Sequence, residues 1–302
     1  MTHLLTRKST IVRALQVTQL TGLRAAFAVL ERTAPATGGR LAANLWCTPP
    51  RVPRRRRRQR AAPPGERFTV YSDGTGVAAE AWGSGPVVYL LPGWGGWRAQ
   101  FDPFVAPLVA AGHRVVSLDP PGHGDSGPSR LGRRRAALTE SAAALRAVAD
   151  VAGPPRAVIA HSGGCLAVTL AMRDGLRVGR LGFISPMANP ATHFPAFARI
   201  LGIGPRVMAH FVPALEHLVG RRIPEFDLPA RAAGRDDLPP LLVAHDREDR
   251  SSPYAGAEAI AEAWAGARLV TTQGLGHVRI LADPTVVKTM VEFATARRLP
   301  VG

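Results

Sequence analysis

From Glu66 onward, short apolar runs alternate with longer helix-like runs, and this alternation restricts the fold more than any other feature of the sequence. The run "PVVYLLPG" is apolar throughout, which is typical of a strand buried on both faces of a sheet. Alternating strands and helices predict a mostly parallel sheet covered by helices on both faces. The expected strands are 66–72 and 76–83, which form an opening hairpin, and then 86–93, 113–120, 156–162, 178–185, 238–246 and 267–274. The expected helices are 97–111, 134–151, one from Gly164, 254–265 and 284–297.

Residues 187–236 interrupt this alternation with a helical segment rich in Phe, Met and Leu. Because the segment lies between two expected strands, we interpret it as a small helical cap inserted over the end of the sheet. The expected domain organisation is therefore an N-terminal segment, 1–64, followed by an α/β domain, 65–302, that carries the cap.

The N-terminal segment holds most of the chain's excess charge. Residues 1–65 contain 13 of the 38 Lys and Arg but only one of the 22 acidic residues. Residues 9–33 predict an amphipathic helix, since Leu20, Leu23, Phe27 and Leu30 share one face. The string "APATGG" is expected to break that helix, and the row Arg54–Arg58 indicates a linker or an extended arm.

Three interpretations of this basic segment remain open. The segment is a solvated linker, or it binds an anionic membrane surface, or it binds nucleic acid. An amphipathic helix followed by a basic patch favours the membrane over nucleic acid, because no aromatic interleaving or known reader fold accompanies the arginines. No specific nucleic-acid partner is therefore expected.

Targeting and membrane signals are the next feature of the sequence, and they favour a cytoplasmic protein that could also associate peripherally with a membrane. No run of about 18 apolar residues is present, and no signal-peptide pattern fits the N-terminus. Cys47 and Cys165 are too few for a disulfide framework and are expected to be free thiols. Neither a metal-ligand pattern nor a phosphate-binding or dinucleotide-binding loop is found, so no metal or cofactor is expected.

The string "AHSGG" places Ser162 between an expected strand and an expected helix, with Ala160 and Gly164 as its small neighbours. This is the pattern of a nucleophile elbow, a strained turn on which a serine is exposed to substrate. In that architecture an acid and then a histidine follow the serine in chain order. Asp246, Glu248 and Asp249 follow one late strand, and His277 follows the last. An ordinary turn that happens to contain serine is the alternative.

Five strings together carry a family resemblance. "LLPGWGGW", "SLDPPGHGDSGPS", "AHSGG", "AHDREDRSSP" and "GLGHVRIL" resemble the α/β-hydrolase superfamily over about residues 66–302. The resemblance implies the α/β-hydrolase fold and a triad of Ser162, Asp249 and His277, with Asp246 as the alternative acid. It implies an oxyanion hole formed by the N–H groups of Trp94 and Gly163. His123 and His161 are expected to organise loops.

Two positions depart from the family pattern, Pro92 where histidine is usual and Ala160 where glycine is usual. The expected function is that of a serine esterase resembling carboxylesterases and lipases, acting on a small hydrophobic ester. Thioesterase, lactonase and carbon–carbon bond hydrolase activities fit the same residues, and a non-catalytic binding protein is a further alternative. Serine at the elbow argues against a haloalkane dehalogenase, which has aspartate there. Candidate residues lining the substrate pocket are Trp97, Met187, Phe194 and Phe197.

Overall fold

The computed structural model describes residues 2–50 and 61–296, with residues 2–17 described by their backbone. The chain divides into two compact units. The smaller unit contains residues 1–46 and 190–223, and the larger unit contains residues 47–189 and 224–302.

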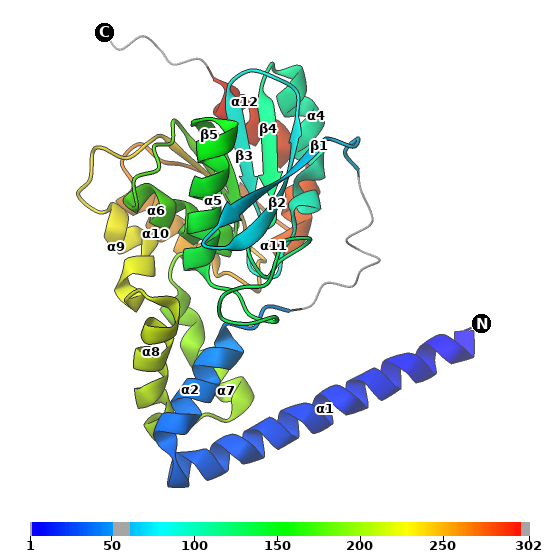
Figure 1. Ribbon diagram of the computed structural model, residues 1–302, viewed down its shortest axis with the longest axis vertical. Helices are drawn as coiled ribbons and strands as arrows, with labels where there is room; N and C mark the ends of the chain where they lie inside the picture. The colour runs from blue at the N-terminus through cyan, green and yellow to red at the C-terminus, as the bar shows by residue number, and fades with distance from the viewer. Residues whose placement is uncertain (1, 51–60, 297–302) are drawn as a thin grey trace. The chain divides into compact units, whose positions relative to one another are not determined.

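The larger unit is built on an eight-stranded sheet in the order β1-β2-β4-β3-β5-β6-β7-β8 (Figure 1). Strands β3 to β8 pair in parallel with their neighbours, whereas β2 pairs antiparallel with both β1 and β4. The mostly parallel sheet predicted from the sequence is confirmed. The strands are β1 (Glu66–Ser72), β2 (Thr75–Trp82), β3 (Val87–Leu91), β4 (Arg114–Leu118), β5 (Pro155–His161), β6 (Leu181–Ile184), β7 (Leu241–Asp246) and β8 (Arg268–Thr272).

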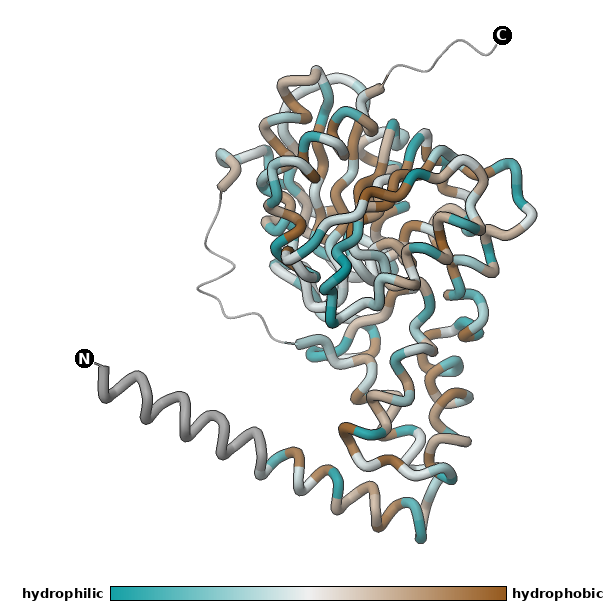
Figure 2. The backbone as a smooth tube through the Cα atoms, turned by 180° about the vertical axis from the view of Figure 1, so that it is seen from behind, coloured by the Kyte–Doolittle hydropathy of each residue, from teal (hydrophilic) through white to brown (hydrophobic). Residues whose placement is uncertain are grey.

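Helices cover both faces of this sheet, with α5 and α6 on one face and α4 and α12 on the other (Figure 1). Every residue of β3 is buried, because the strand lies near the centre of the sheet, between β4 and β5. The strands form the apolar centre of the larger unit (Figure 2). Its helices are η1 (Arg98–Phe101), α4 (Asp102–Ala110), α5 (Leu138–Ala152), α6 (Gly163–Arg173), η3 (Ile223–Phe226), α9 (Leu228–Ala232), α10 (Tyr254–Ala263), α11 (Gly276–Arg279), η4 (Ile280–Ala282) and α12 (Pro284–Thr295).

The smaller unit is entirely helical in its described part. The face predicted for the first helix points inward, since Phe27 is fully buried and Leu20, Leu23 and Leu30 are partly buried. An aromatic cluster of Trp46, Phe194, Phe197 and Phe211 packs in the same unit, together with buried aliphatic residues such as Val207 and Leu215. Its elements are α1 (Thr2–Thr33), α2 (Pro35–Trp46), η2 (Pro190–His193), α7 (Phe194–Leu201) and α8 (Pro205–Val219).

Two details of the smaller unit differ from the sequence analysis. "APATGG" interrupts the helix only at Ala34, and Pro35 begins α2 at once, because proline fits the first turn of a helix. A Cβ atom at Gly38 would lie 2.6 Å from Val207, and one at Gly39 would lie 2.6 Å from the backbone of His210. The two glycines therefore serve the close approach of α2 to α8 and do not end a helix.

The insertion expected as a single cap is divided between the units. Residues 190–223 pack with the N-terminal helices, while α9 packs against α10 in the larger unit. Helix α5 also begins at Leu138 and not at Arg134, because residues 134–137 form an irregular segment before it. The boundary expected at residue 64 stays a prediction.

In residues 2–50 and 61–296, no helix is long and apolar enough to cross a membrane. The row Arg54–Arg58 lies outside the described residues, and both the cytoplasmic location and the membrane contact stay predictions. Cys47 and Cys165 are free and buried, and burial raises the pKa of the Cys47 thiol to about 12.

Candidate active site

Ser162 occupies a strained turn between β5 and α6. Its φ of 52° and ψ of −123° lie in a region that residues with side chains rarely adopt. Strain of this kind costs about 1–3 kcal/mol and persists only where the surrounding structure enforces it. The backbone N–H of Ser162 donates to the carbonyl of Ile184 at the end of β6, 3.0 Å away, which fixes the turn against the neighbouring strand.

The small residues around Ser162 are required by close backbone contacts. A Cβ atom at Gly164 would lie 2.8 Å from the carbonyl oxygen of Leu91 and 2.7 Å from that of Pro92. A Cβ atom at Gly93 would lie 2.8 Å from the Cβ atom of Ser162. Ala160, the departure noted in the sequence, is fully buried within β5, where its methyl group is accommodated.

His277 reaches Ser162 from the segment that follows β8. Its Nε2 lies 3.1 Å from the Ser162 hydroxyl oxygen. Gly274 and Gly276 precede it with φ values of 82° and 64°, which only glycine adopts readily, and they turn the chain into the short helix α11. The His277 side chain is 18% exposed.

Asp249 completes a hydrogen-bonded chain on the far side of the imidazole. Its Oδ2 accepts a hydrogen bond from Nδ1 of His277 at 2.7 Å. Its Oδ1 accepts from the backbone N–H groups of Ser251 and Ser252, at 2.8 and 2.9 Å. Burial raises the pKa of the Asp249 carboxyl, but hydrogen bonds from His245, His277 and Ser252 outweigh it and hold that pKa well below its ordinary value.

Asp246, the alternative acid, makes a different set of contacts. Its Oδ2 accepts from the Thr272 hydroxyl at 2.8 Å and from the Leu275 N–H at 2.9 Å. Burial raises its pKa, whereas these hydrogen bonds lower it, and the net direction is downward. Asp246 therefore anchors the start of the loop that carries His277. Among the described residues, the carboxylate bonded to the imidazole ring is that of Asp249 and not that of Asp246.

His245 is a neighbour of the site that the sequence analysis did not single out. Its Nε2 lies 3.3 Å from Oδ2 of Asp249 and 3.0 Å from the carbonyl oxygen of Ser252, and its side chain is fully buried. The signal in the sequence is its position four residues before Asp249, near the end of β7.

His161, beside the serine, contacts His277 directly. The two rings lie 4.7 Å apart between centroids, and Nε2 of His161 is 2.8 Å from the His277 carbonyl oxygen. Burial lowers the pKa of His161 to about 3, so the ring is neutral near pH 7. Because a carbonyl only accepts, Nε2 must carry the proton and donate to it.

The backbones of Trp94 and Gly163 lie close together. A Cβ atom at Gly163 would lie 3.7 Å from the nitrogen of Trp94. Trp94 sits in a tight turn closed by a hydrogen bond from the Gly96 N–H to the Gly93 carbonyl, 2.9 Å long. The two N–H groups thus belong to segments in close contact beside Ser162.

His123 holds that turn from the loop after β4. Its Nε2 accepts from the Gly95 N–H at 3.0 Å, and its Nδ1 donates to the carbonyl of Pro121 at 3.0 Å. The edge of one ring faces the other in the pair His123–Trp94, with centroids 5.8 Å apart. Burial lowers the pKa of His123, which favours the neutral ring that this pair of hydrogen bonds requires.

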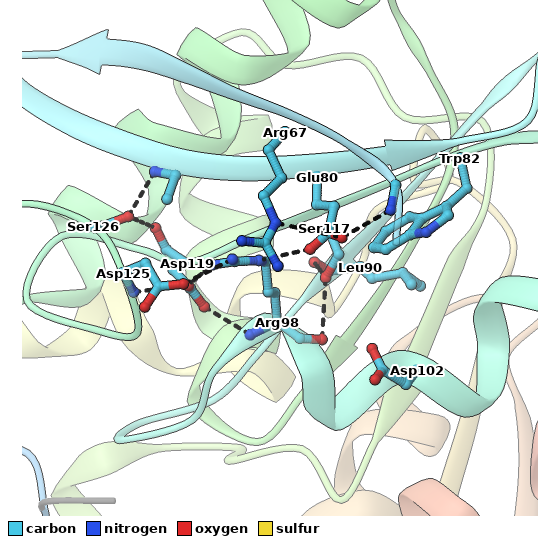
Figure 3. Close-up of polar contacts among 12 residues, drawn as sticks. Arg67, Glu80, Trp82, Leu90, Arg98, Asp102, Ser117, Asp119, Asp125 and Ser126 are labelled. Carbon is cyan, nitrogen blue, oxygen red and sulfur yellow. Dashed lines mark hydrogen bonds and ion pairs between the residues drawn. The ribbon is translucent and has the colours of Figure 1, made fainter. Parts of the chain in front are cut away.

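A buried arginine joins the same two loops (Figure 3). Arg98, just after the turn, pairs with Asp119, with Asp125 at 2.8 Å and with Glu80 at 3.2 Å. Its backbone N–H also donates to Asp119 at 2.7 Å. Ion pairs of this kind tie the turn at residues 93–96 to the end of β4, and three carboxylates compensate one buried guanidinium.

The four candidate pocket residues are divided between the units. Trp97 and Met187 belong to the larger unit, where the Met187 N–H donates to the Ser162 carbonyl at 3.3 Å. The indole Nε1 of Trp97 is buried and has no hydrogen-bond partner among the described residues. Phe194 and Phe197 belong to the smaller unit and pack there against Trp46.

As for metals, no group of three or more His, Cys, Asp or Glu side chains is arranged to hold an ion in the described part of the chain. What the arrangement offers is a serine hydroxyl, an imidazole able to take its proton, and a carboxylate that orients the imidazole.

Comparison with known proteins points the same way. The sequence model of the alpha/beta hydrolase family matches residues 88–288. Over 92 residues, 30% of this chain and 31% of the relative, the sequence is 42% identical to 2-hydroxy-6-oxononadienedioate/2-hydroxy-6-oxononatrienedioate hydrolase 1 of Dechloromonas aromatica. The match thus spans about a third of that relative's length.

Two further similarities cover more of the chain. It is 27% identical to the pimeloyl-[acyl-carrier protein] methyl ester esterase of Neisseria meningitidis over 65% of this chain and 87% of that protein. Among solved structures, Est1E of Butyrivibrio proteoclasticus, determined with ferulic acid bound, superimposes with a TM-score of 0.57 at 20% identity. That superposition covers 76% of this chain and 100% of Est1E, and it shows a common fold.

Proposed function

Because the chain belongs to the α/β-hydrolase family, we propose that it is a serine hydrolase that cleaves carboxylic esters through an acyl-enzyme on Ser162. One observation carries the proposal. The Ser162 hydroxyl, the His277 imidazole and the Asp249 carboxylate form a continuous chain of hydrogen bonds, 3.1 and 2.7 Å long. Serine is a weak nucleophile alone, and a positioned base oriented by a carboxylate activates it.

In the first half of the reaction, Oγ of Ser162 attacks the ester carbonyl carbon while Nε2 of His277 takes the hydroxyl proton. The resulting imidazolium is stabilised by Asp249, whose depressed pKa keeps the carboxylate ionised. The tetrahedral intermediate collapses when His277 returns its proton to the leaving alkoxide. An acyl group then remains on Ser162.

The negative oxygen of the intermediate requires two donors, and the N–H groups of Gly163 and Trp94 fill this role in the proposal. Donors already in position stabilise the transition state without reorganisation, and the loss of one typically costs about 10²–10³ in rate. The departure at Pro92 leaves this proposal intact, because the donor is the N–H of Trp94.

Hydrolysis of the acyl-enzyme repeats the same steps with water as the nucleophile. His277 takes a proton from the water as it attacks, and then returns a proton to Oγ of Ser162 as the carboxylic acid departs. The substrate is a small hydrophobic ester in this proposal, with Trp97 and Met187 lining its pocket. Phe194 and Phe197 stay predicted lining residues.

A carbon–carbon bond hydrolase is the second candidate. The similarity to the Dechloromonas aromatica protein supports it, and the residues around Ser162 would serve that chemistry too. The similarity to the methyl ester esterase, which covers more than twice as much of this chain, supports the ester. Thioester and lactone hydrolysis use the same acyl transfer, and fold alone does not select among these substrates.

The proposal is tested by labelling the full chain with a fluorophosphonate beside Ser162→Ala. Nitrophenyl esters of short and long chain, a thioester, a lactone and a vinylogous 1,5-diketone serve as parallel substrates. Loss of the nucleophile should lower turnover by about 10⁶, if subtilisin is a guide.

Each outcome decides a point. Labelling and ester turnover that both disappear in Ser162→Ala support the serine esterase. Cleavage of the diketone without ester turnover overturns the esterase and supports the carbon–carbon bond hydrolase. A folded wild-type protein that neither labels nor turns over any substrate overturns the enzyme and favours a binding protein.

A further inference from the structure

The smaller unit carries a large excess of positive charge. Residues 1–46 and 190–223 contain ten Lys and Arg but only two acidic residues, Glu31 and Glu216. From the contacts of this unit, we propose that it docks on an anionic lipid bilayer through four exposed arginines, Arg24, Arg32, Arg199 and Arg206, which we call the cationic seam. This proposal is independent of the reaction at Ser162.

Both acidic residues of the unit are engaged in holding its helices. Glu31 accepts from the backbone N–H groups of Arg206 and Val207, at 2.8 and 3.0 Å, and so caps the N-terminus of α8. Glu216 pairs with Arg222 at 2.9 Å and accepts from the Ile223 N–H at 2.8 Å. Within residues 2–50 and 61–296, neither carboxylate forms an ion pair with the four guanidinium groups of the seam, so their charges remain available to an external anion.

The four arginines are brought together by the contact of α1 with α7 and α8. Arg24 donates to the carbonyl of Arg199 at 3.4 Å, and Arg206 donates to the carbonyl of Arg32 at 3.5 Å. These carbonyl acceptors are neutral and fix where the guanidinium groups lie without cancelling their charge. The seam therefore consists of two pairs of arginines, Arg24 with Arg199 where α1 contacts α7, and Arg32 with Arg206 where α1 contacts α8.

Exposed apolar side chains accompany the charges. Val29 on α1 is 59% exposed, and Ile200, next to Arg199 on α7, is 57% exposed. Basic residues gain from the negative surface potential of a membrane, while apolar side chains enter the boundary between headgroups and acyl chains. The combination suits a bilayer better than a purely ionic partner.

Nucleic acid fits this surface less well. Single-stranded binding relies on exposed aromatic rings on which bases stack. In the described part of the smaller unit, Phe27 is fully buried, and the rings of Trp46, Phe194, Phe197 and Phe211 pack on one another. The aromatic residues therefore build the unit's core and leave no stacking platform.

The test is flotation of the full chain with vesicles of phosphatidylcholine alone and of phosphatidylcholine mixed with phosphatidylserine. The seam variant is R24Q/R206Q, which removes one arginine from each pair. Its matched control is R177Q/R231Q, which removes exposed arginines from the larger unit. A third variant changes Arg54–Arg58 to glutamine. Circular dichroism and hydrolysis of a soluble short-chain ester check that each variant folds.

Wild type should bind the phosphatidylserine vesicles, bind the neutral ones weakly, and release as salt rises. Each seam charge removed should weaken binding about fivefold, and R177Q/R231Q should bind like wild type. Ile200→Ser should weaken binding while leaving its salt dependence unchanged. The proposal is overturned if wild type ignores the anionic vesicles, if the seam variant binds like its control, or if only the Arg54–Arg58 variant loses binding. Tighter binding to a polyribonucleotide than to the vesicles would also overturn it.

Discussion

The Nε2–H of His161 donates a hydrogen bond to the backbone carbonyl of His277, 2.8 Å away. The residue that precedes Ser162 thus holds the backbone of the residue whose imidazole faces Ser162. The end of β5 and the short helix α11, whose bonded residues are 116 apart in sequence, are thus joined beside the Ser162 hydroxyl.

Replacing His161 should disturb catalysis more than binding. In His161→Leu the His277 carbonyl loses its donor, and a small displacement of the imidazole is costly because proton transfer depends on position. We expect kcat to fall about 10- to 100-fold with KM little changed. His161→Gln, which can still donate to the carbonyl, should keep most of the activity. Equal losses in both variants would show that the hydrogen bond is not the cause.

The low pKa of His161 makes the protein less stable in mild acid. Its pKa is about 3 in the folded chain against an ordinary value of 6.5, so between these values the unfolded chain binds a proton that the folded chain does not. The free energy of unfolding should therefore fall as pH drops from 6.5 toward 3. Below 3.8, the unfolded chain also binds a proton at Asp249 that the folded chain does not, because the folded pKa of Asp249 is depressed too, and the loss of stability increases.

Urea denaturation across this range measures the effect. His161→Gln should flatten the fall in the free energy of unfolding between pH 6.5 and 4. His217→Gln, at an exposed position on α8, is the matched control and should follow the wild-type curve. A wild-type curve that His161→Gln leaves unchanged would contradict the assignment.

Asp246, which ends β7, and Asp249, which follows that strand, should differ in their effects on catalysis. Asp249→Asn removes the carboxylate that orients His277 and should lower kcat by about 10⁴ if a trypsin-like triad is a guide. It should also lower Tm, because the depressed pKa of Asp249 marks a carboxylate that stabilises the fold. Asp246→Asn weakens the acceptor for Thr272 and Leu275 and should cost about 1–3 kcal/mol of stability with a smaller loss of kcat. Steady-state kinetics beside thermal unfolding separate the two. The opposite pattern would make Asp246 the acid.

His123 should matter through the turn that carries Trp94. His123→Phe keeps an aromatic ring against Trp94 but removes the acceptor for the Gly95 N–H, so the turn loses its fixed geometry. We expect kcat to fall about 10-fold, and the affinity for a boronic acid that mimics the tetrahedral intermediate to fall in parallel. His123→Gln should restore part of both. Weaker substrate binding with an unchanged kcat would argue against a role in the oxyanion hole.

Much of the larger unit could be predicted from sequence because its signals are local. The strand β3 is a continuous apolar run, and the elbow at Ser162 is a short string of small residues. The order of serine, acid and histidine is the one expected from the family resemblance, and the three residues follow β5, β7 and β8. Such features depend on residues close together in the chain or on the end of a strand.

The features that could not be predicted from the sequence depend on residues far apart in the chain or on contacts made only after folding. His245 lies four residues before Asp249, but this spacing alone does not predict a contact, which forms only when β7 and the following loop fold. The packing of α2 on α8 is equally hidden, since nothing near Gly38 indicates that its partner lies some 170 residues later. Two glycines in a row predict a helix end when their packing partner is unknown, whereas Gly38 and Gly39 lie within α2 and pack against α8.

The contact between α2 and α8 has a consequence for how the protein is made. The first 46 residues leave the ribosome long before Val207 and Phe211, both fully buried in the finished unit, have been translated. Until then the apolar side of α2 has no packing partner. Bringing α2 and α8 together closes a loop of more than a hundred residues, which is slow and entropically costly. A nascent chain of this kind depends on shielding during synthesis, and a protein trimmed back to residue 65 would leave α8 permanently bare and prone to aggregate.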